Sequence, residues 1–206
     1  MMNKLILETQ ISIDGYIADE KGDTSWMVWN WGQEWNWDKD LQAYHTNLNK
    51  SVNSILVSSQ MAQEGFNAHW KQVTQDPTDK RFEFANHIVN AEKFVVSKTL
   101  TTETEIPGGW QNISILKDNL ENDIESLKSK SNGNIIVYGG AKLVSSLIKS
   151  NLIDEYHFII NPVALGQGLP IFKKLTNLKM VNSAPFECGI IVNHYQKEWE
   201  NGSGKI

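Results

Sequence analysis

Short apolar runs alternate along the chain with segments in which apolar residues recur every three or four positions. Most of the runs are nearly continuous, which is typical of strands buried on both faces, as in a parallel sheet covered by helices. Six strands are therefore predicted, at Leu5–Ile13, Ser54–Val57, Lys93–Val96, Ile113–Leu116, Asn134–Tyr138 and Tyr156–Val163.

The segments between these strands follow the 3.6-residue period of an amphipathic helix. One helix is predicted between Asp38 and Lys50, a second around Phe82, Ala85 and Ile88, and a last one over Ala141–Lys149. A further helix carries its apolar stripe on Leu120, Ile124 and Leu127. Asp118 is expected to cap it, with Glu121 three residues later completing a capping box.

Alternation of strand and helix implies right-handed crossovers and a mainly parallel sheet. The C-terminal part differs, because Pro185–Gly189 leaves no room for a helix between the strands expected at Leu178–Ala184 and Ile190–Trp199. An antiparallel hairpin is predicted there. The expected fold is thus α/β, a three-layer sandwich with a mixed, mainly parallel sheet. We expect one domain over residues 1–200 and a flexible polar tail at 201–206.

Composition narrows the function only by exclusion. The net charge of -5 argues against nucleic acid as the main partner, and no stretch approaches the roughly 18 apolar residues of a membrane span. The N-terminal residues lack the pattern of a secretory signal. Cys188 is the only cysteine, which suits a reducing compartment, so we expect a cytoplasmic protein.

The sharpest local signal lies where an apolar strand stops at Gly139 and Gly140 and a helix begins at Ala141 and Lys142. Glycines at such a point let a ligand approach the backbone, and the first N–H groups of the helix then face that ligand. Phosphate or pyrophosphate is its natural occupant. A plain tight turn that needs glycine for geometry alone is the other interpretation.

Two hydroxyls and a lysine, Ser97, Lys98 and Thr99, follow another predicted strand. They could bind a ribose phosphate, with Lys98 as a point charge, or Lys98 could simply be solvated where the chain leaves the sheet.

Five of the eight tryptophans lie within twelve residues, at Trp26, Trp29, Trp31, Trp35 and Trp37. Rigid aromatic side chains next to the first strand could form the wall of a pocket for a flat heterocycle. They could equally pack a long loop onto the body or form a dimer contact.

Other chemistries have weaker support. The five histidines, His45, His69, His87, His157 and His194, show no metal-binding spacing, so no metal site is expected. Cys188 is expected to be a structural thiol. Acids near the tryptophans, Asp14, Glu34, Asp38 and Asp40, could donate a proton if buried, although most such carboxylates only aid solubility.

Taken in order, these segments resemble the dihydrofolate reductase superfamily. The opening Ile11–Ala18, Ser54–Val57, Val95–Leu100, Asn134–Lys142 and Leu152–Gly168 are closest to its branch related to the reductase domain of the bifunctional riboflavin-biosynthesis deaminase/reductase. The resemblance spans nearly the whole chain, from Leu5 to the closing hairpin.

The resemblance implies an NADPH-dependent reductase of a pterin- or aminopyrimidine-like small molecule, and usually a homodimer. By position, Gly139, Gly140, Ala141 and Lys142 would hold the pyrophosphate. Ser97, Lys98 and Thr99 would meet the adenosine ribose and its 2′-phosphate. Lys98 stands where relatives often carry arginine, which leaves NADH as a possible cofactor.

After the second strand, relatives commonly carry Gly-Arg and a hydroxyl residue, but this chain has Ser58, Ser59 and Gln60. Ser58 and Ser59 are therefore expected at the cofactor without the arginine charge. Asp14 or Asp40 is the expected proton relay, and Trp26 the expected substrate contact. The alternative hypothesis is a non-catalytic binding protein that kept the fold and the nucleotide site.

Overall fold

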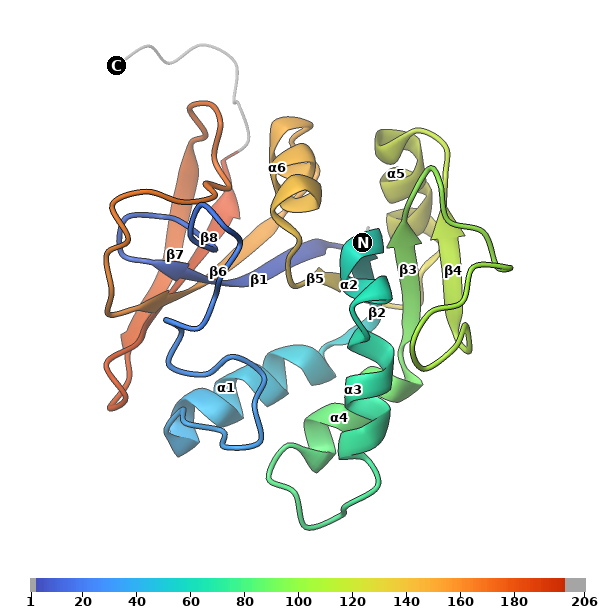
Figure 1. Ribbon diagram of the computed structural model, residues 1–206. Coiled ribbons are helices and arrows are strands. Elements are labelled where there is room, and N and C mark those ends of the chain that lie inside the picture. The colour runs from blue at the N-terminus through green and yellow to red at the C-terminus, as the bar shows by residue number, and fades with distance from the viewer. Residues whose placement is uncertain (1–2, 199–206) are drawn as a thin grey trace.

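The computed structural model describes residues 3–198, which form an eight-stranded sheet in the order β4-β3-β2-β5-β1-β6-β8-β7 (Figure 1). The strands from β4 to β6 in this order run parallel, and β8 and β7 close the sheet as an antiparallel pair. The strand bounds are Leu5–Ser12 (β1), Val52–Ser58 (β2), Glu92–Val96 (β3), Ile113–Leu116 (β4), Asn134–Val137 (β5), Glu155–Asn161 (β6), Leu178–Pro185 (β7) and Ile191–Lys197 (β8).

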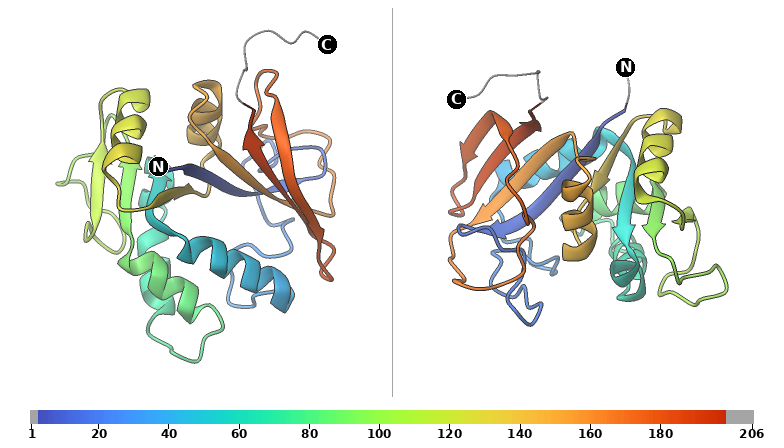
Figure 2. Two further views of the ribbon diagram at one scale, coloured as in Figure 1. Left: turned by 180° about the vertical axis from the view of Figure 1, so that it is seen from behind. Right: turned by 90° about the horizontal axis from the view of Figure 1, so that it is seen from above.

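Helices cover the parallel part of the sheet on both faces (Figures 1 and 2). Helices α1 (Lys39–Lys50), α3 (Phe66–Val73) and α4 (Phe82–Asn90) lie on one face, with the short α2 (Ser59–Gln63) leading into them. Helices α5 (Leu120–Lys130) and α6 (Ala141–Lys149) lie on the other face. Each face has its own apolar core, one around Leu41, Trp70 and Phe84 and the other around Ile124 and Val144.

Strand β1 shows why the sheet separates these two cores. All eight of its residues are buried, and alternate side chains point to opposite faces. Leu5, Leu7 and Ile11 belong to the core beneath α5 and α6, whereas Ile6 belongs to the core beneath α1. The α1 side of β1 therefore includes two buried polar residues, Glu8 and Gln10.

The predicted fold class is confirmed, including the antiparallel hairpin at the C-terminal end of the sheet. The predicted cap at Asp118 is wrong. The side chain of Asn119 accepts hydrogen bonds from the amides of Glu121 and Asn122, so the helix starts one residue later and Glu121 is placed too early for a capping box. Two helices, α2 and α3, were not predicted.

Strand ends account for the remaining differences. Strand β6 stops at Asn161, two residues before the predicted end, because Pro162 has no amide hydrogen to continue the ladder. The predicted tail at 201–206 and Trp199 lie outside the described residues. Within residues 3–198, no helix is long and apolar enough to cross a membrane.

Candidate active site

A cavity of about 380 Å³ opens at the carboxyl ends of the parallel strands. Strand β1 contributes Glu8, Thr9 and Gln10 to its lining, and the β5–α6 turn contributes Tyr138 to Ala141. The rest comes mainly from the segment between residues 17 and 37 and from Ser58 and α2. This is the edge of an open α/β sheet at which ligands ordinarily bind.

The glycine turn forms one wall of the cavity. Gly140 has a φ of 86°, and a Cβ there would lie 2.7 Å from both Cβ and Oγ of Ser58. The fold therefore requires glycine at position 140 whether or not a ligand binds. Gly139 is different, because its φ is not positive and a Cβ there would meet no protein atom within 4 Å. The space beside Gly139 is open to the cavity, as a ligand cradle requires.

Helix α6 starts at this wall without a side-chain cap. Its first turn is closed by the amide of Val144 donating to the carbonyl of Gly140, which leaves the preceding amides of the helix facing outward. The positive end of the α6 dipole and the free N–H groups of its first turn favour an anion at this point. The residues of this wall fit the pyrophosphate of a dinucleotide cofactor.

The neighbouring strand ends continue this wall in one direction. Sheet order places β2 beside β5 and β3 beside β2, with Ser58 in register with Val96. Ser58 caps α2 by accepting from the amide of Met61, and Ser97 accepts from the amide of Leu100. Lys98 and Thr99 are exposed at the same edge. The predicted residues from all three strand ends therefore lie along one edge of the sheet.

Lysine and arginine are missing from the described residues that line the cavity. Lys98 and Lys142 lie outside that lining, and the cavity has two acids, Glu8 and Glu64. Backbone amides and hydroxyl groups are thus the main anion-binding groups of this wall.

A buried polar network forms the floor of the cavity. Nδ1 of His45 lies 2.8 Å from Oε1 of Glu8, and both side chains are almost completely buried. The side-chain amide of Asn49 donates from Nδ2 to Oε2 of the Glu8 carboxylate at 3.2 Å. Among the described residues, Nε2 of His45 has no hydrogen-bond partner.

The hydroxyl of Tyr138 extends this network by donating to Oδ1 of Asn49. Burial, and next the charge of Glu8, raise the pKa of Tyr138 well above its ordinary value. The hydroxyl therefore remains a donor at neutral pH, and the network holds a carboxylate and an imidazole in a fixed arrangement at the base of the cavity.

The segment from Trp26 to Trp37, called the tryptophan segment below, lines the cavity and also belongs to the apolar core. Trp29, Trp31 and Trp37 line the cavity, and Trp29 stacks on Trp35 with ring centroids 5.2 Å apart. Trp31 also packs against Trp70 at 5.1 Å. Trp26 is partly exposed and donates to the carbonyl of Asp23, outside the cavity lining.

Buried polar side chains hold this segment on the sheet. Gln10 donates to the carbonyl of Trp29 at 2.8 Å, and Asn161 accepts from the amide of Val28 at 2.8 Å. Arg81 donates to the carbonyls of Trp31 and Gly32. Hydrogen bonds from the sheet and from Arg81 therefore fix the middle of this segment, at residues 28–29 and 31–32.

The two acids expected from the sequence lie elsewhere. The carboxylate of Asp14 accepts from the hydroxyl of Ser12 at 2.6 Å and from the amide of Gly166 at 2.7 Å, which lowers its pKa, with Ser12 as the largest cause. It connects the turn after β1 to the loop after β6. Asp40 is exposed in the first turn of α1. Neither side chain lines the cavity.

Sequence reasoning missed Glu8 and His45. They are 37 positions apart, so no local spacing connects them. A signal was present in β1, where the face that begins with Ile6 continues with Glu8 and Gln10, while the opposite face is mainly aliphatic, with Leu5, Leu7 and Ile11.

Comparisons with known proteins agree with this architecture. A family model described as the RibD C-terminal domain matches residues 3–192. The chain is 29% identical over 194 residues to the "Uncharacterized protein YyaP" of Bacillus subtilis, covering 91% of this chain and 92% of that protein.

Two solved structures share the fold. RibD of Acinetobacter baumannii superposes with a TM-score of 0.64 at 12% identity, over 96% of this chain and 59% of its own. The riboflavin biosynthesis reductase Rib7 of Saccharomyces cerevisiae superposes with a TM-score of 0.56 at 16% identity, over 96% and 90%. The resemblance found in the sequence is confirmed, and the chain belongs to the RibD C-terminal domain family.

Proposed function

We propose that the protein is an NAD(P)H-dependent reductase of a pterin- or aminopyrimidine-like small molecule. The observation that carries the proposal is the open side of Gly139 next to the uncapped start of α6, in the wall of a cavity that also contains Glu8 and His45. A cofactor site and a proton-holding pair thus share one cavity.

Binding of the cofactor would use groups along three neighbouring strand ends. Gly139, Gly140 and the first amides of α6 would hold the pyrophosphate. Ser58 and Ser97 would approach the ribose, while Lys98 would approach a 2′-phosphate from the exposed edge. Nicotinamide cofactors supply a hydride when bound, and every other requirement of the reaction falls to the protein.

Reduction of a C=O or C=N bond adds a hydride to carbon and a proton to oxygen or nitrogen. Glu8 and His45 are the residues placed to hold and deliver that proton, because they are buried, hydrogen-bonded to each other and part of the cavity lining. Geometry favours them over Asp14 and Asp40, whose side chains do not line the cavity. Trp29, Trp31 and Trp37 would exclude water and pack against a flat ring.

The test is a titration of the purified protein with NADPH and with NADH, followed by tryptophan emission. Bound nicotinamide is expected to quench the tryptophans of the cavity wall at micromolar to millimolar cofactor. Loss of NADPH absorbance is then followed with a panel of aminouracils and pterins. No quenching by either cofactor contradicts the proposal, and quenching without turnover on any heterocycle favours the non-catalytic alternative.

We further propose a cytoplasmic homodimer. The β7–β8 hairpin lies at the opposite end of the sheet from β3 and β4 (Figure 2), and it exposes Met180, Val181 and Ile191. Exposed apolar side chains are typical of an interaction surface when they gather on one hairpin. A mass measurement in solution that gives a monomer contradicts the dimer.

A further inference from the structure

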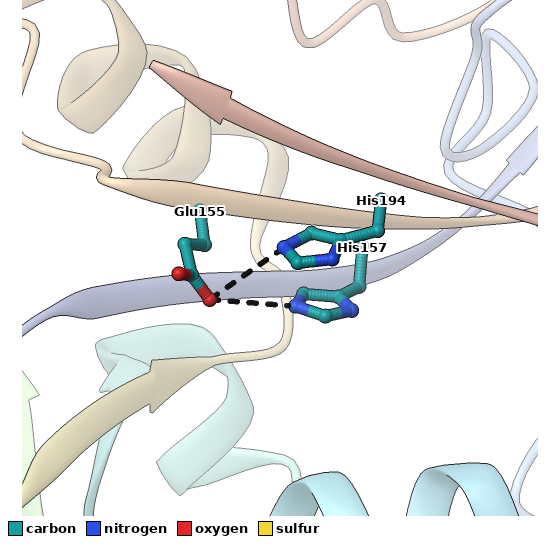
Figure 3. Close-up of side chains that lie close together, drawn as sticks. All are labelled: Glu155, His157 and His194. Atoms are coloured by element: carbon teal, nitrogen blue, oxygen red, sulfur yellow. Dashed lines mark ion pairs between the residues drawn. The ribbon is translucent and has the colours of Figure 1, made fainter. Parts of the chain in front are cut away.

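A second cluster of ligand-type side chains lies on the sheet outside the cavity lining. Glu155 and His157 are two residues apart on β6 and so share one face, and His194 of β8 is directly paired with His157. The two imidazole rings are stacked, with centroids 4.1 Å apart and planes at 15°. Both point an edge at the same oxygen of Glu155 (Figure 3).

The distances within this cluster are too long for hydrogen bonds. Oε2 of Glu155 lies 3.6 Å from Nε2 of His194 and 3.9 Å from Nε2 of His157. Within residues 3–198, neither Nε2 atom has a hydrogen-bond partner, although both are shielded from solvent. All five histidines have a buried Nε2 without a hydrogen-bond partner, but among the described residues only these two face the same carboxylate oxygen within 4 Å.

A tetrahedral ion explains the spacing. Zinc binds histidine nitrogen and carboxylate oxygen at roughly 2.0 to 2.2 Å, which puts neighbouring ligands on a tetrahedron about 3.4 Å apart. The three ligand atoms here lie within 4.8 Å of one another, and the two measured pairs are within a few tenths of an ångström of that spacing. Because the rings are stacked with planes 15° apart, one imidazole must also turn so that both Nε2 atoms face one ion.

The surroundings of the cluster orient the ligands as in known metal sites. The hydroxyl of Tyr44 is hydrogen-bonded to Nδ1 of His157, which fixes the ring and directs Nε2 at Glu155. Lys4 and Gln196 donate to Oε1 of Glu155, at 2.5 and 3.3 Å. Oε2 is thereby left for the two histidines.

We propose that Glu155, His157 and His194 bind one divalent transition-metal ion, with Zn²⁺ as the best match. Two imidazoles and one carboxylate are ligands that zinc accepts, and three protein ligands leave a fourth position open. The His194 side chain is 19% exposed, so the ion has a path from solvent. This site is independent of the proposed reductase activity.

The experiment uses full-length protein freed of any histidine tag and treated with a chelator. Titration calorimetry with Zn²⁺ is expected to show one ion bound per chain in the wild type. The His194→Gln variant should bind Zn²⁺ roughly tenfold more weakly, or weaker still. Glu155→Gln should weaken binding as well. His87→Gln is the matched control, since His87 also has a buried Nε2 without a partner but lies in the last turn of α4.

Each variant is first compared with the wild type by thermal melting in chelator, which establishes that it folds. Co²⁺ replaces Zn²⁺ as a spectroscopic probe, and tetrahedral Co²⁺ absorption is expected in the wild type and in His87→Gln only. The proposal is overturned if Zn²⁺ does not bind at one per chain, or if His194→Gln and Glu155→Gln bind it as the wild type does.

Discussion

Gly139→Ala separates the two interpretations of the glycine turn, because folding and cofactor binding should respond in opposite directions. The added methyl group meets no protein atom within 4 Å, and the backbone has no positive φ. Alanine at a compatible position stabilises a protein by about 0.4 to 1 kcal/mol, because the unfolded chain loses freedom. A slightly higher melting temperature is therefore expected.

The same methyl group should weaken cofactor binding. It projects into the space beside the start of α6, where a phosphate would accept hydrogen bonds from backbone amides. Loss of one hydrogen bond to a charged group costs about 1.5 to 3 kcal/mol. This corresponds to a Kd for NADPH or NADH that is roughly 10- to 150-fold higher than in the wild type.

The assay is a fluorescence titration with each cofactor, combined with a thermal melt of the free protein. Gly32→Ala is the matched control, because a Cβ there also meets nothing within 4 Å and its backbone also has no positive φ. Gly32 lies in the tryptophan segment outside the cavity lining, so its Kd should match the wild type. An unchanged Kd in Gly139→Ala would refute the cradle and leave a plain turn.

Four further substitutions test separate parts of the structure. Gly140→Ala should destabilise the fold by about 1 to 3 kcal/mol in urea unfolding, since it combines a positive φ with a clash on Ser58, and wild-type stability would contradict the geometry. Glu8→Gln should lower kcat about 100-fold or more while the cofactor Kd stays within about twofold; an unchanged kcat removes Glu8 from the chemistry. Lys98→Ala should weaken NADPH by roughly two- to fivefold and NADH not at all, as expected for an exposed charge, and equal effects on both cofactors would exclude a 2′-phosphate contact. Burial lowers the pKa of Lys93 to about 8, and unfolding returns it to 10.5, so the unfolded chain binds more protons and stability should rise between pH 8 and 10.5. Lys93→Met should remove this rise, worth about 3 kcal/mol, and a parallel pH profile in the variant would show that another group causes it.

Local patterns were enough to predict most of the fold. Buried strands and amphipathic helices leave a periodic trace in the sequence, and their alternation predicts a mainly parallel sheet. The strand order, with β5 between β2 and β1, was not predicted, because it depends on which strands pair across long distances in the chain. Helix α2 was not predicted because five residues are too few to show a helical period. Gly65, with a φ of 99°, separates it from α3. The cap at Asn119 escaped because Asp118 and Asn119 are both good caps, and only the backbone decides between them.

In the candidate site, too, the sequence predicted the local features but not the contacts between residues far apart in the chain. The glycine turn is local, so the sequence identified it together with the strand ends beside it. Long-range pairs leave no such trace: Glu8 meets His45 across 37 positions, and His157 meets His194 across a strand pairing. The tryptophan segment remained undecided because a wall and a core use the same residues, and the structure gives it both roles.

Three polar side chains, Glu8, His157 and His194, form a row across β1, β6 and β8 beneath α1, where an apolar core would have aliphatic residues. Glu8 of β1 is in register with His157 of β6, and His157 is in register with His194 of β8. Helix α1 meets this row with consecutive residues, since Tyr44 bonds to His157 and His45 to Glu8. A sheet face that needed only stability would carry aliphatic side chains at these three positions, because buried polar groups are costly unless satisfied. Departures from local rules are expected at functional sites, and this row contains Glu8 of the proposed proton-holding pair and two of the proposed metal ligands.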